Sequence, residues 1–278
     1  MKEKAVNLET LVATMHQTDF SLVDKMNIQS DVVFANQCDR NGIEVVNKDG
    51  ITAKMISTDT RGVGLNRNIA LLMSSADILL FSDDDFTYND GYAERVLRAF
   101  DELPDADMIL FGGELTRNGE VYHVLHERTK RLHWWGAMKY GTYSIAVRRS
   151  SLLRHSIFFT QLFGGGCIYA TGEDSKFILD CIRSGMRAYS YDYVLGRCAM
   201  DVSTCFFGYD EKYFYNKGAW LAASFPKGKH FMKWYFIFRF AKLCELSRRQ
   251  IRRQINKGIC GYRRLEPYAD SKQQGDKI

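Results

Sequence analysis

The chain has 278 residues, 46% hydrophobic and 26% charged, so it can bury a sizeable core in one large α/β domain. Only three prolines, and no low-complexity tract or internal repeat, argue against long disordered linkers. Seven cysteines without a Cys-x-x-Cys pair argue against a disulfide framework or a zinc site, and favour reduced thiols in a cytosol.

The net charge of +5 is unevenly distributed along the chain. Residues 227–264 hold 12 Lys or Arg and a single acid, a net charge of +11, so the remainder carries −6. A basic tail on a mildly acidic body implies a polyanionic partner for the tail alone. The first residues, MKEKAVNLETLVATM, contain two glutamates and no long apolar run, so we expect no signal peptide and a cytoplasmic protein.

Short apolar runs alternate with segments of helical spacing. The expected strands are Leu8–Thr14, Asp31–Ala35, Thr52–Ser57, Asp77–Phe81, Asp107–Phe111 and Thr142–Val147. The expected helices are Arg61–Ser75, Asp90–Leu103 before Pro104, and Ser175–Ser184 before Gly185. This alternation predicts an α/β fold with a mostly parallel sheet flanked by helices, whose ligands bind beyond the carboxyl ends of the strands.

Three adjacent carboxylates, Asp83-Asp84-Asp85, follow directly on the apolar run DILLF. Their mutual repulsion at the mouth of a buried strand costs free energy unless a cation offsets it. Mg or Mn takes carboxylate oxygens and leaves positions open for substrate phosphates. A solvated acidic turn is the alternative interpretation, but its place after a hydrophobic strand favours a metal site.

Two further segments fit the same site, and a third is expected beside the acceptor. Glu173-Asp174 begins a helix, where an acid is favoured and where a simple cap would look the same. Arg61–Asn68 supplies two cations and two glycines, or else is a solvated loop entering a helix. Gly164-Gly165-Gly166 lacks the Gly-Lys-Ser/Thr of a phosphate loop and is interpreted as a flexible loop beside an acceptor.

Over residues 8–225 the sequence resembles the family 2 glycosyltransferases of the GT-A fold, a Rossmann-like sheet. The resemblance rests on TRGVGLNRNIALLMSSADILLFSDDDF, with its DxD core, and on LFGGGCIYATGEDSKFILDCIRSGMRAYSYDYVLG, with its Glu-Asp motif. It implies an inverting, nucleotide-sugar-dependent enzyme that uses Mn or Mg.

The resemblance also implies roles for individual residues. Thr14 and Asp39 would contact the base and ribose, and Arg67 the base or phosphates; Arg61 and Asp84 would complete the donor site. Asp83 would face the ribose or the metal, Asp85 would coordinate it, and Asp174 would be the general base. A carboxylate can take the proton of an attacking hydroxyl, and a metal can stabilise the leaving diphosphate. One base and direct displacement imply inversion.

The sequence departs from the family pattern in two places. Ala13-Thr14-Met15-His16 replaces the usual Pro-Thr-Tyr-Asn, and Arg197–Phe207 lacks the histidine that some members use as a metal ligand. Asp201 or Ser203 could stand in its place. The acceptor side is assigned to Gly164–Gly166, Glu173 and the pair Trp134-Trp135, although core packing is the more ordinary role of two tryptophans.

The tail predicts one basic amphipathic helix over Phe231–Ile255. Its apolar side holds Ile237, Phe240, Leu243, Cys244, Ile251 and Ile255, and its basic side Arg239, Lys242, Arg249, Arg252 and Arg253. Charges interrupt any spanning segment, so the helix suits a membrane surface, or packs on the catalytic domain. We therefore expect a catalytic domain at 1–225 and a membrane-associated tail at 226–278.

These features together predict a transferase that moves a sugar from a nucleotide-diphosphate sugar to a saccharide or lipid-linked acceptor. The resemblance to the family implies that the donor is a UDP-sugar. Bacterial surface polysaccharide synthesis at the inner face of the cell membrane would fit. The alternatives are a sugar nucleotidyltransferase, disfavoured because Thr14–Phe20 lacks glycine and arginine, and a non-catalytic membrane-binding protein on a transferase scaffold. No nucleic-acid-binding motif accompanies the basic tail, so no nucleic-acid partner is expected.

Overall fold

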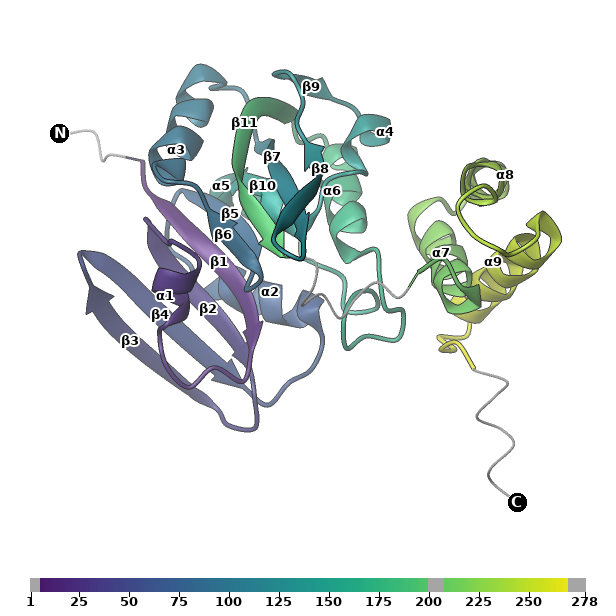
Figure 1. Ribbon diagram of the computed structural model, residues 1–278, viewed down its shortest axis with the longest axis horizontal. Coiled ribbons are helices and arrows are strands. Elements are labelled where there is room, and N and C mark those ends of the chain that lie inside the picture. The colour runs from purple at the N-terminus through teal and green to yellow at the C-terminus, as the bar shows by residue number, and fades with distance from the viewer. Residues whose placement is uncertain (1–5, 200–207, 270–278) are drawn as a thin grey trace.

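The computed structural model describes residues 6–199 and 208–269, and its strands form one eleven-stranded sheet flanked by helices (Figure 1). The strands are β1 (Leu8–Met15), β2 (Asp31–Gln37), β3 (Gly42–Lys48), β4 (Ile51–Thr58), β5 (Ile78–Asp83), β6 (Phe86–Tyr88), β7 (Met108–Arg117), β8 (Glu120–Leu125), β9 (Lys130–Leu132), β10 (Ile145–Arg148) and β11 (Ala188–Ala199). The helices are α1 (Leu22–Lys25), α2 (Val63–Met73), α3 (Tyr92–Glu102), α4 (Trp134–Ala137), the 3-10 turn η1 (Thr142–Ser144), α5 (Arg149–His155), α6 (Glu173–Arg183), α7 (Glu211–Ser224), α8 (Lys229–Phe240) and α9 (Arg248–Tyr262).

The strand order is β3-β4-β2-β1-β5-β10-β7-β11-β6, with β8 beside β7 and β9 beside β11. Neighbouring strands are parallel from β4 through β2 and β1 to β5, and again between β7 and β11. Strand β10 runs antiparallel to both of its neighbours, β5 and β7. The edge strands β3 and β6 run antiparallel to β4 and β11, respectively. The α/β fold is confirmed, but the sheet is mixed rather than mostly parallel, because an apolar run does not encode the direction in which a strand enters the sheet.

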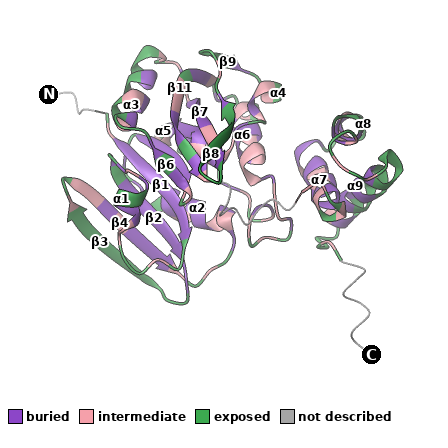
Figure 2. Ribbon diagram, in the orientation of Figure 1, coloured by how far each residue is buried: buried purple, intermediate pink, exposed green. Residues whose placement is uncertain are grey.

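The central strands are buried on both faces, which explains their continuous apolar sequences. In β5, Ile78 and Leu80 join the core under α1 and α3, whereas Leu79 and Phe81 join the core under α2, α5 and α6. Alternate side chains of a strand point to opposite faces, so one apolar run serves two layers. Figure 2 shows these strands as the buried centre of the molecule and β3 as an exposed edge.

Two hairpin strands, β3 and β8, were not expected from the sequence. Each closes on its neighbour through a two-residue turn with both residues at positive φ, Asp49-Gly50 and Asn118-Gly119. Such turns select Asp-Gly and Asn-Gly, so these dipeptides were the available signal. Both strands are largely exposed, which weakened the apolar pattern that would have predicted them.

The basic tail forms two helices rather than the single expected helix over Phe231–Ile255. Helix α8 ends at Phe240, and α9 begins after Ser247, whose side chain accepts a hydrogen bond from the Gln250 amide in a capping box. This local cap satisfies helix-start donors and separates the two helices. No helix in the described ranges combines the length and the apolar content that crossing a bilayer requires.

Helices α7, α8 and α9 pack together as a bundle beside the sheet (Figure 1). Ile237, Phe240, Ile251 and Ile255 of the predicted apolar side are buried in it, whereas Leu243 remains 55% exposed. The same core contains Phe163, Tyr169 and Leu179 from the sheet domain. The apolar side of the tail therefore packs against the rest of the protein.

Candidate active site

The candidate site lies at the carboxyl edge of the parallel strands β1, β2, β4 and β5. Because these strands run in register in one direction, the segments that follow them meet at this edge. Thr14 lies near the end of β1, Asp39 follows β2, Arg61 follows β4, and Asp83 ends β5. The structure thus brings together residues that lie up to 70 positions apart in sequence.

The three aspartates occupy different environments. Thr14 donates a hydrogen bond from Oγ1 to Asp84 Oδ2 at 2.5 Å. Burial, followed by repulsion from Asp83 and Asp84, raises the pKa of Asp85 to about 7. Burial likewise raises the pKa of Asp84. A carboxylate in this position is destabilised in its charged form, as expected where a cation supplies the missing counter-charge.

Arg67 connects the aspartate cluster to the Glu-Asp motif. Its side chain is 4% exposed and donates to Asp83 Oδ1 at 2.6 Å and to Glu173 Oε1 at 3.1 Å. Although burial opposes its charge, Asp83 and Glu173 hold the pKa of Arg67 above its ordinary value. Asp83 and Glu173 therefore face one another across a single guanidinium, and the two motifs share one site.

The asparagines beside Arg67 fix its helix in place. Asn66 donates through Nδ2 to the carbonyl of Ala35 at 2.7 Å, and the Asn68 amide exchanges two hydrogen bonds with the backbone of Phe159. These contacts tie the start of α2 to β2 and to the segment before α6. Within the segment Arg61–Asn68, the side chains of Asn66, Arg67 and Asn68 are buried and support the site. This part of the segment is therefore not a solvated loop.

Asp174 lies in the first turn of α6, beside Glu173. Its Oδ1 accepts a hydrogen bond from the backbone amide of Ser175 at 2.6 Å. Burial and the adjacent Glu173 nevertheless raise its pKa to about 6, against the opposing effect of Arg67. The charge of Asp83 also raises the pKa of Asp174, so the aspartate cluster and Asp174 interact electrostatically. A carboxylate whose conjugate acid has this pKa is largely ionised near neutral pH and can accept a proton there.

The turn before Asp174 depends on the C-terminal bundle. Gly172 has a φ of +103°, and Trp220 Nε1 of α7 donates to its carbonyl at 3.0 Å. A Cβ at Gly172 would lie 2.6 Å from Trp220 Cδ1. The bundle therefore supports the backbone that aims the Glu-Asp motif.

Asp39 and Arg61 form an exposed ion pair at 2.8 Å at the rim. Arg61 also donates to the carbonyls of Cys38, Asp59 and Thr60. Arg61 thus holds together the loops after β2 and β4, and Asp39 points its carboxylate to solvent. Their contacts with a donor remain predictions.

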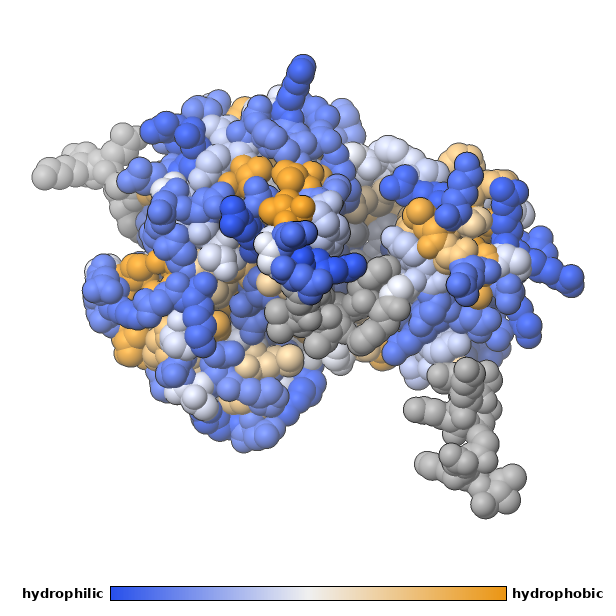
Figure 3. Space-filling model, in the orientation of Figure 1, coloured by the Kyte–Doolittle hydropathy of each residue, from blue (hydrophilic) through white to orange (hydrophobic). Residues whose placement is uncertain are grey.

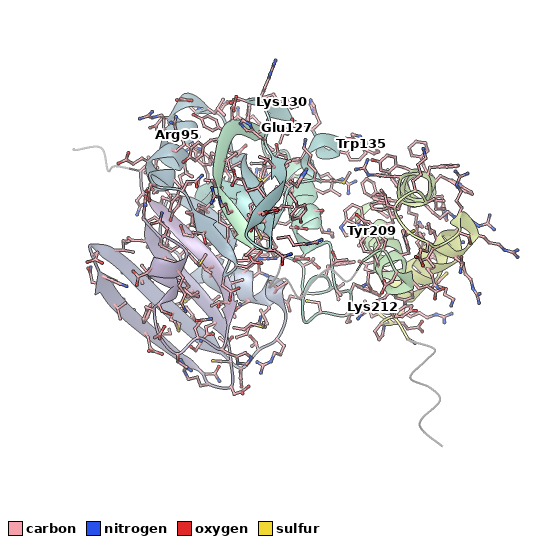
Figure 4. The ribbon with its side chains drawn as sticks, in the orientation of Figure 1. Arg95, Glu127, Lys130, Trp135, Tyr209 and Lys212 are labelled. Carbon is pink, nitrogen blue, oxygen red and sulfur yellow. The ribbon has the colours of Figure 1, made fainter. Side chains whose placement is uncertain are left out.

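The glycine segment packs against the start of α2. Gly165 accepts a hydrogen bond from the Val63 amide at 2.9 Å, and a Cβ at Gly164 would meet Val63 and Glu173 within 3 Å. Trp134 packs against Phe225 in the bundle core, whereas Trp135 is 45% exposed and faces the bundle (Figure 4). An acceptor role for these residues stays a prediction.

Three residues at the site were missed from the sequence. Tyr143 stacks on Phe86 at 4.9 Å, and burial, with Cys198, Asp174 and Asp85 nearby, raises its pKa. The Cys198 thiol, whose pKa burial and Asp85 raise, interacts with Asp85. Burial lowers the pKa of Lys217 on α7 to about 8, although the negative charge of Asp174 acts to raise it. Each is an isolated residue in an ordinary element, and no sequence pattern marks it.

A complete protein-derived metal cage is absent from the described ranges, where no group of three His, Cys, Asp or Glu is arranged to hold an ion. Asp201 and Ser203, the expected substitutes for a ligating histidine, lie outside the described residues. The aspartates at the strand edge still fit a hard cation that shares its coordination with substrate oxygens, because they leave an uncompensated carboxylate at Asp85.

The sequence matches the family model for glycosyl transferase family 2 over residues 12–157, more than half of the chain. The chain belongs to glycosyl transferase family 2. This assignment covers the strand edge and the aspartate cluster, and it confirms the resemblance first seen in the sequence. A comparison with curated protein sequences finds no match.

Solved structures agree with the GT-A fold of this glycosyltransferase. S. aureus TarS 1-349 matches with a TM-score of 0.61 at 15% identity, over 98% of this chain and 93% of that one. Its complex with UDP gives a TM-score of 0.60 at 14% identity over the same shares. Its complex with UDP-GlcNAc gives 0.57 at 13% identity, over 98% and 77%.

Proposed function

We propose that this glycosyltransferase moves a sugar from a nucleotide-diphosphate sugar, a UDP-sugar, to a saccharide or lipid-linked acceptor with inversion. The single observation that carries the proposal is the pairing of Arg67 with both Asp83 and Glu173, which supports one site for the aspartate cluster and for Asp174, the neighbour of Glu173. The structures of TarS with UDP and UDP-GlcNAc, which share the fold, support the choice of donor.

Asp174 is the general base of the proposed reaction. Its carboxylate takes the proton of the acceptor hydroxyl while that oxygen attacks the anomeric carbon. The bond from that carbon to the diphosphate breaks in the same step, and the nucleoside diphosphate leaves. A single displacement inverts the anomeric carbon and needs no second carboxylate as a covalent nucleophile.

Asp85 and Asp83 would hold Mn or Mg in this site. When bound, the cation offsets the charge that develops on the departing diphosphate. The raised pKa of Asp85 supports this assignment, because burial next to Asp83 and Asp84 leaves its charge uncompensated. Asp83 also pairs with Arg67, which fixes the orientation of its carboxylate toward the site.

The remaining strand-edge residues form the proposed donor site. Thr14 and Asp39 would contact the nucleoside, with Asp84 held in place by Thr14. Arg61 would orient Asp39, with which it pairs at 2.8 Å. Arg67 would act on the donor chiefly through Asp83, because its guanidinium is already engaged by the carboxylates of Asp83 and Glu173.

Surface polysaccharide synthesis remains the proposed pathway. A sugar nucleotidyltransferase is a weaker alternative, because the family match is to glycosyl transferases. A non-catalytic scaffold is separated from an enzyme by donor hydrolysis, measured with and without Mn. The enzyme should release nucleoside diphosphate only when Mn is present.

The donor assignment is tested by thermal shift against a panel of nucleotide sugars with Mn. A true donor at a hundred times its dissociation constant adds about 2.7 kcal/mol to the free energy of unfolding. In Asp85→Asn this Mn-dependent shift should disappear, while the unliganded protein stays as stable or becomes more so, because the substitution removes an unfavourable charge.

The matched control is Asp101→Asn, an exposed aspartate on α3, which should keep the full donor shift. The proposal fails if no nucleotide sugar stabilises the wild-type protein. The metal assignment alone fails if Asp85→Asn keeps the Mn-dependent shift.

A further inference from the structure

Helix α8 presents a row of aromatic side chains to solvent. Phe231 is 76% exposed, Trp234 46% and Phe238 54%, and their spacing puts them on one side of the helix. The rings of Trp234 and Phe238 stack with centroids 6.1 Å apart. The opposite side of α8 supplies the bundle core, and this row is not part of that core. Exposed contiguous aromatics of this kind mark an interaction surface.

The outer side of α9 forms an open basic groove of about 500 Å³. It is lined by Arg249, Arg252, Arg253, Asn256, Lys257 and Cys260. Arg264 is the only cation from Lys227 onward that forms an ion pair within the described part of the chain. The charge of the groove is therefore not neutralised by its described neighbours.

The aromatic row and the basic groove are continuous. The Arg248 guanidinium lies 5.1 Å from the ring centroid of Phe238, and Lys233 Nζ donates to Asn256 Oδ1 at 3.0 Å. Arg239 of α8 and Lys242, which follows the helix, are both exposed and extend the cationic border. Figure 3 shows hydrophobic surface over the bundle, bordered by hydrophilic side chains. We call these residues of the two helices the α8–α9 surface.

We propose that the α8–α9 surface docks this enzyme on an anionic lipid bilayer. Aromatic side chains enter the boundary between headgroups and acyl chains, and unpaired Lys and Arg attract anionic headgroups. A soluble polyanion would need the cations alone, whereas the exposed row of Phe231, Trp234 and Phe238 gains only from an apolar partner. Charge and exposed aromatic area thus point to the same occupant.

The bundle carries this surface on one side and supports the candidate base on the other. Trp220 contacts Gly172 at the Glu-Asp turn, and Trp135 of α4 packs on Tyr235 of α8 at 4.8 Å. A docked bundle would hold the site near the bilayer, where a lipid-linked acceptor is presented. Docking itself does not depend on the proposed reaction, so its test uses binding rather than activity.

The experiment is co-sedimentation of the full chain with phosphatidylcholine vesicles, with and without phosphatidylglycerol. We expect binding only to the anionic vesicles, falling as salt rises. The double variant Trp234→Ala/Phe238→Ala and the double variant Arg249→Glu/Arg253→Glu should each weaken the partition coefficient by at least about tenfold. Circular dichroism and thermal unfolding confirm that each variant folds.

Matched controls remove similar groups elsewhere on the surface. Ile43→Ala/Val45→Ala removes exposed apolar side chains of β3, and Arg98→Glu/Arg131→Glu reverses exposed charges; both should bind like the wild type. Equal loss in these controls, or wild-type binding by the α8–α9 variants, would overturn the proposal. So would the absence of vesicle binding together with polyphosphate binding that needs Arg249 and Arg253 but not Trp234 and Phe238.

Discussion

Arg67 is the residue on which the geometry of the site depends. Its buried guanidinium lies between Asp83 and Glu173, so its removal leaves two partly buried carboxylates without their counter-charge. We expect Arg67→Met to lower the free energy of unfolding by about 3–5 kcal/mol. Urea denaturation measures the change.

Arg61→Met is the control for this prediction, because Arg61 forms an exposed ion pair with Asp39. Exposed pairs contribute about 1 kcal/mol or less, so this variant should remain close to the wild type. Equal urea midpoints of unfolding for Arg67→Met and Arg61→Met would show that Arg67 is not the structural link between the aspartate cluster and the Glu-Asp motif.

Asp174 sets the expected pH dependence of the reaction. Burial and Glu173 raise its pKa to about 6, so below that pH the proposed base carries a proton and cannot accept another. With Mn saturating, so that Asp85 stays ionised, we expect kcat/KM to fall roughly tenfold per pH unit below about 6 and to be flat just above it. A pH–rate profile measures this; a fall that begins only near the ordinary pKa of aspartate would contradict it.

The same raised pKa predicts the behaviour of Asp174→Asn. The folded state binds this proton more tightly than the unfolded state, so the ionised carboxylate lowers stability above pH 6. The variant should lose roughly 10²- to 10⁴-fold in kcat and yet unfold at a higher temperature at about pH 7.5. Asp180→Asn on the same helix, where Asp180 pairs with Lys176, should keep activity and gain no stability.

At the scale of single elements, the start of α6 depends on a close approach by α7. Gly172→Ala would force a non-glycine residue to a φ of +103° and place its Cβ 2.6 Å from Trp220 Cδ1. We expect lost stability and a lower kcat, because the displaced turn carries Glu173 and Asp174. Thermal unfolding and steady-state kinetics measure both.

Gly185 offers a matched control, because it has a φ of +100° and, apart from its two chain neighbours, no described residue has an atom within 4 Å of the place that a methyl group would take. Gly185→Ala should cost only the strain of positive φ, about 1–2 kcal/mol, without a change in kcat. If both variants lose the same stability and keep kcat, the contact with Trp220 does not position the motif.

At the scale of the whole molecule, the C-terminal helices share a core with the sheet domain. Ile255 is fully buried in a cluster that includes Phe163 and Leu179, whereas Leu243 is 55% exposed. Ile255→Ala should lower the free energy of unfolding by about 2–5 kcal/mol, and Leu243→Ala should change it by less than about 0.5 kcal/mol. Chemical denaturation with circular dichroism should show a single transition for both; a separate early transition in Ile255→Ala would mean that the bundle unfolds alone.

The α/β class, the central strands and the positions of the two acidic motifs can be read from the amino-acid sequence without coordinates. These features are local: continuous apolar runs mark strands buried on both faces, and clustered carboxylates after β5 are visible without coordinates. The resemblance to family 2 followed from the order of those motifs, and the family match confirms it. The exposed strands β3 and β8 could have been found from their Asp-Gly and Asn-Gly turns.

How these parts meet depends on the folded chain and could not be predicted from local sequence. The structure sets the direction in which β10 enters the sheet. It pairs Arg67 with both Asp83 and Glu173. It also brings Tyr143 and Lys217, which are far from Asp174 in sequence, close to that residue. It also divided the tail into two helices and buried its apolar side, leaving a different set of aromatics exposed. Local propensity is encoded residue by residue, whereas burial and ion pairing depend on which distant surfaces the folded chain brings into contact.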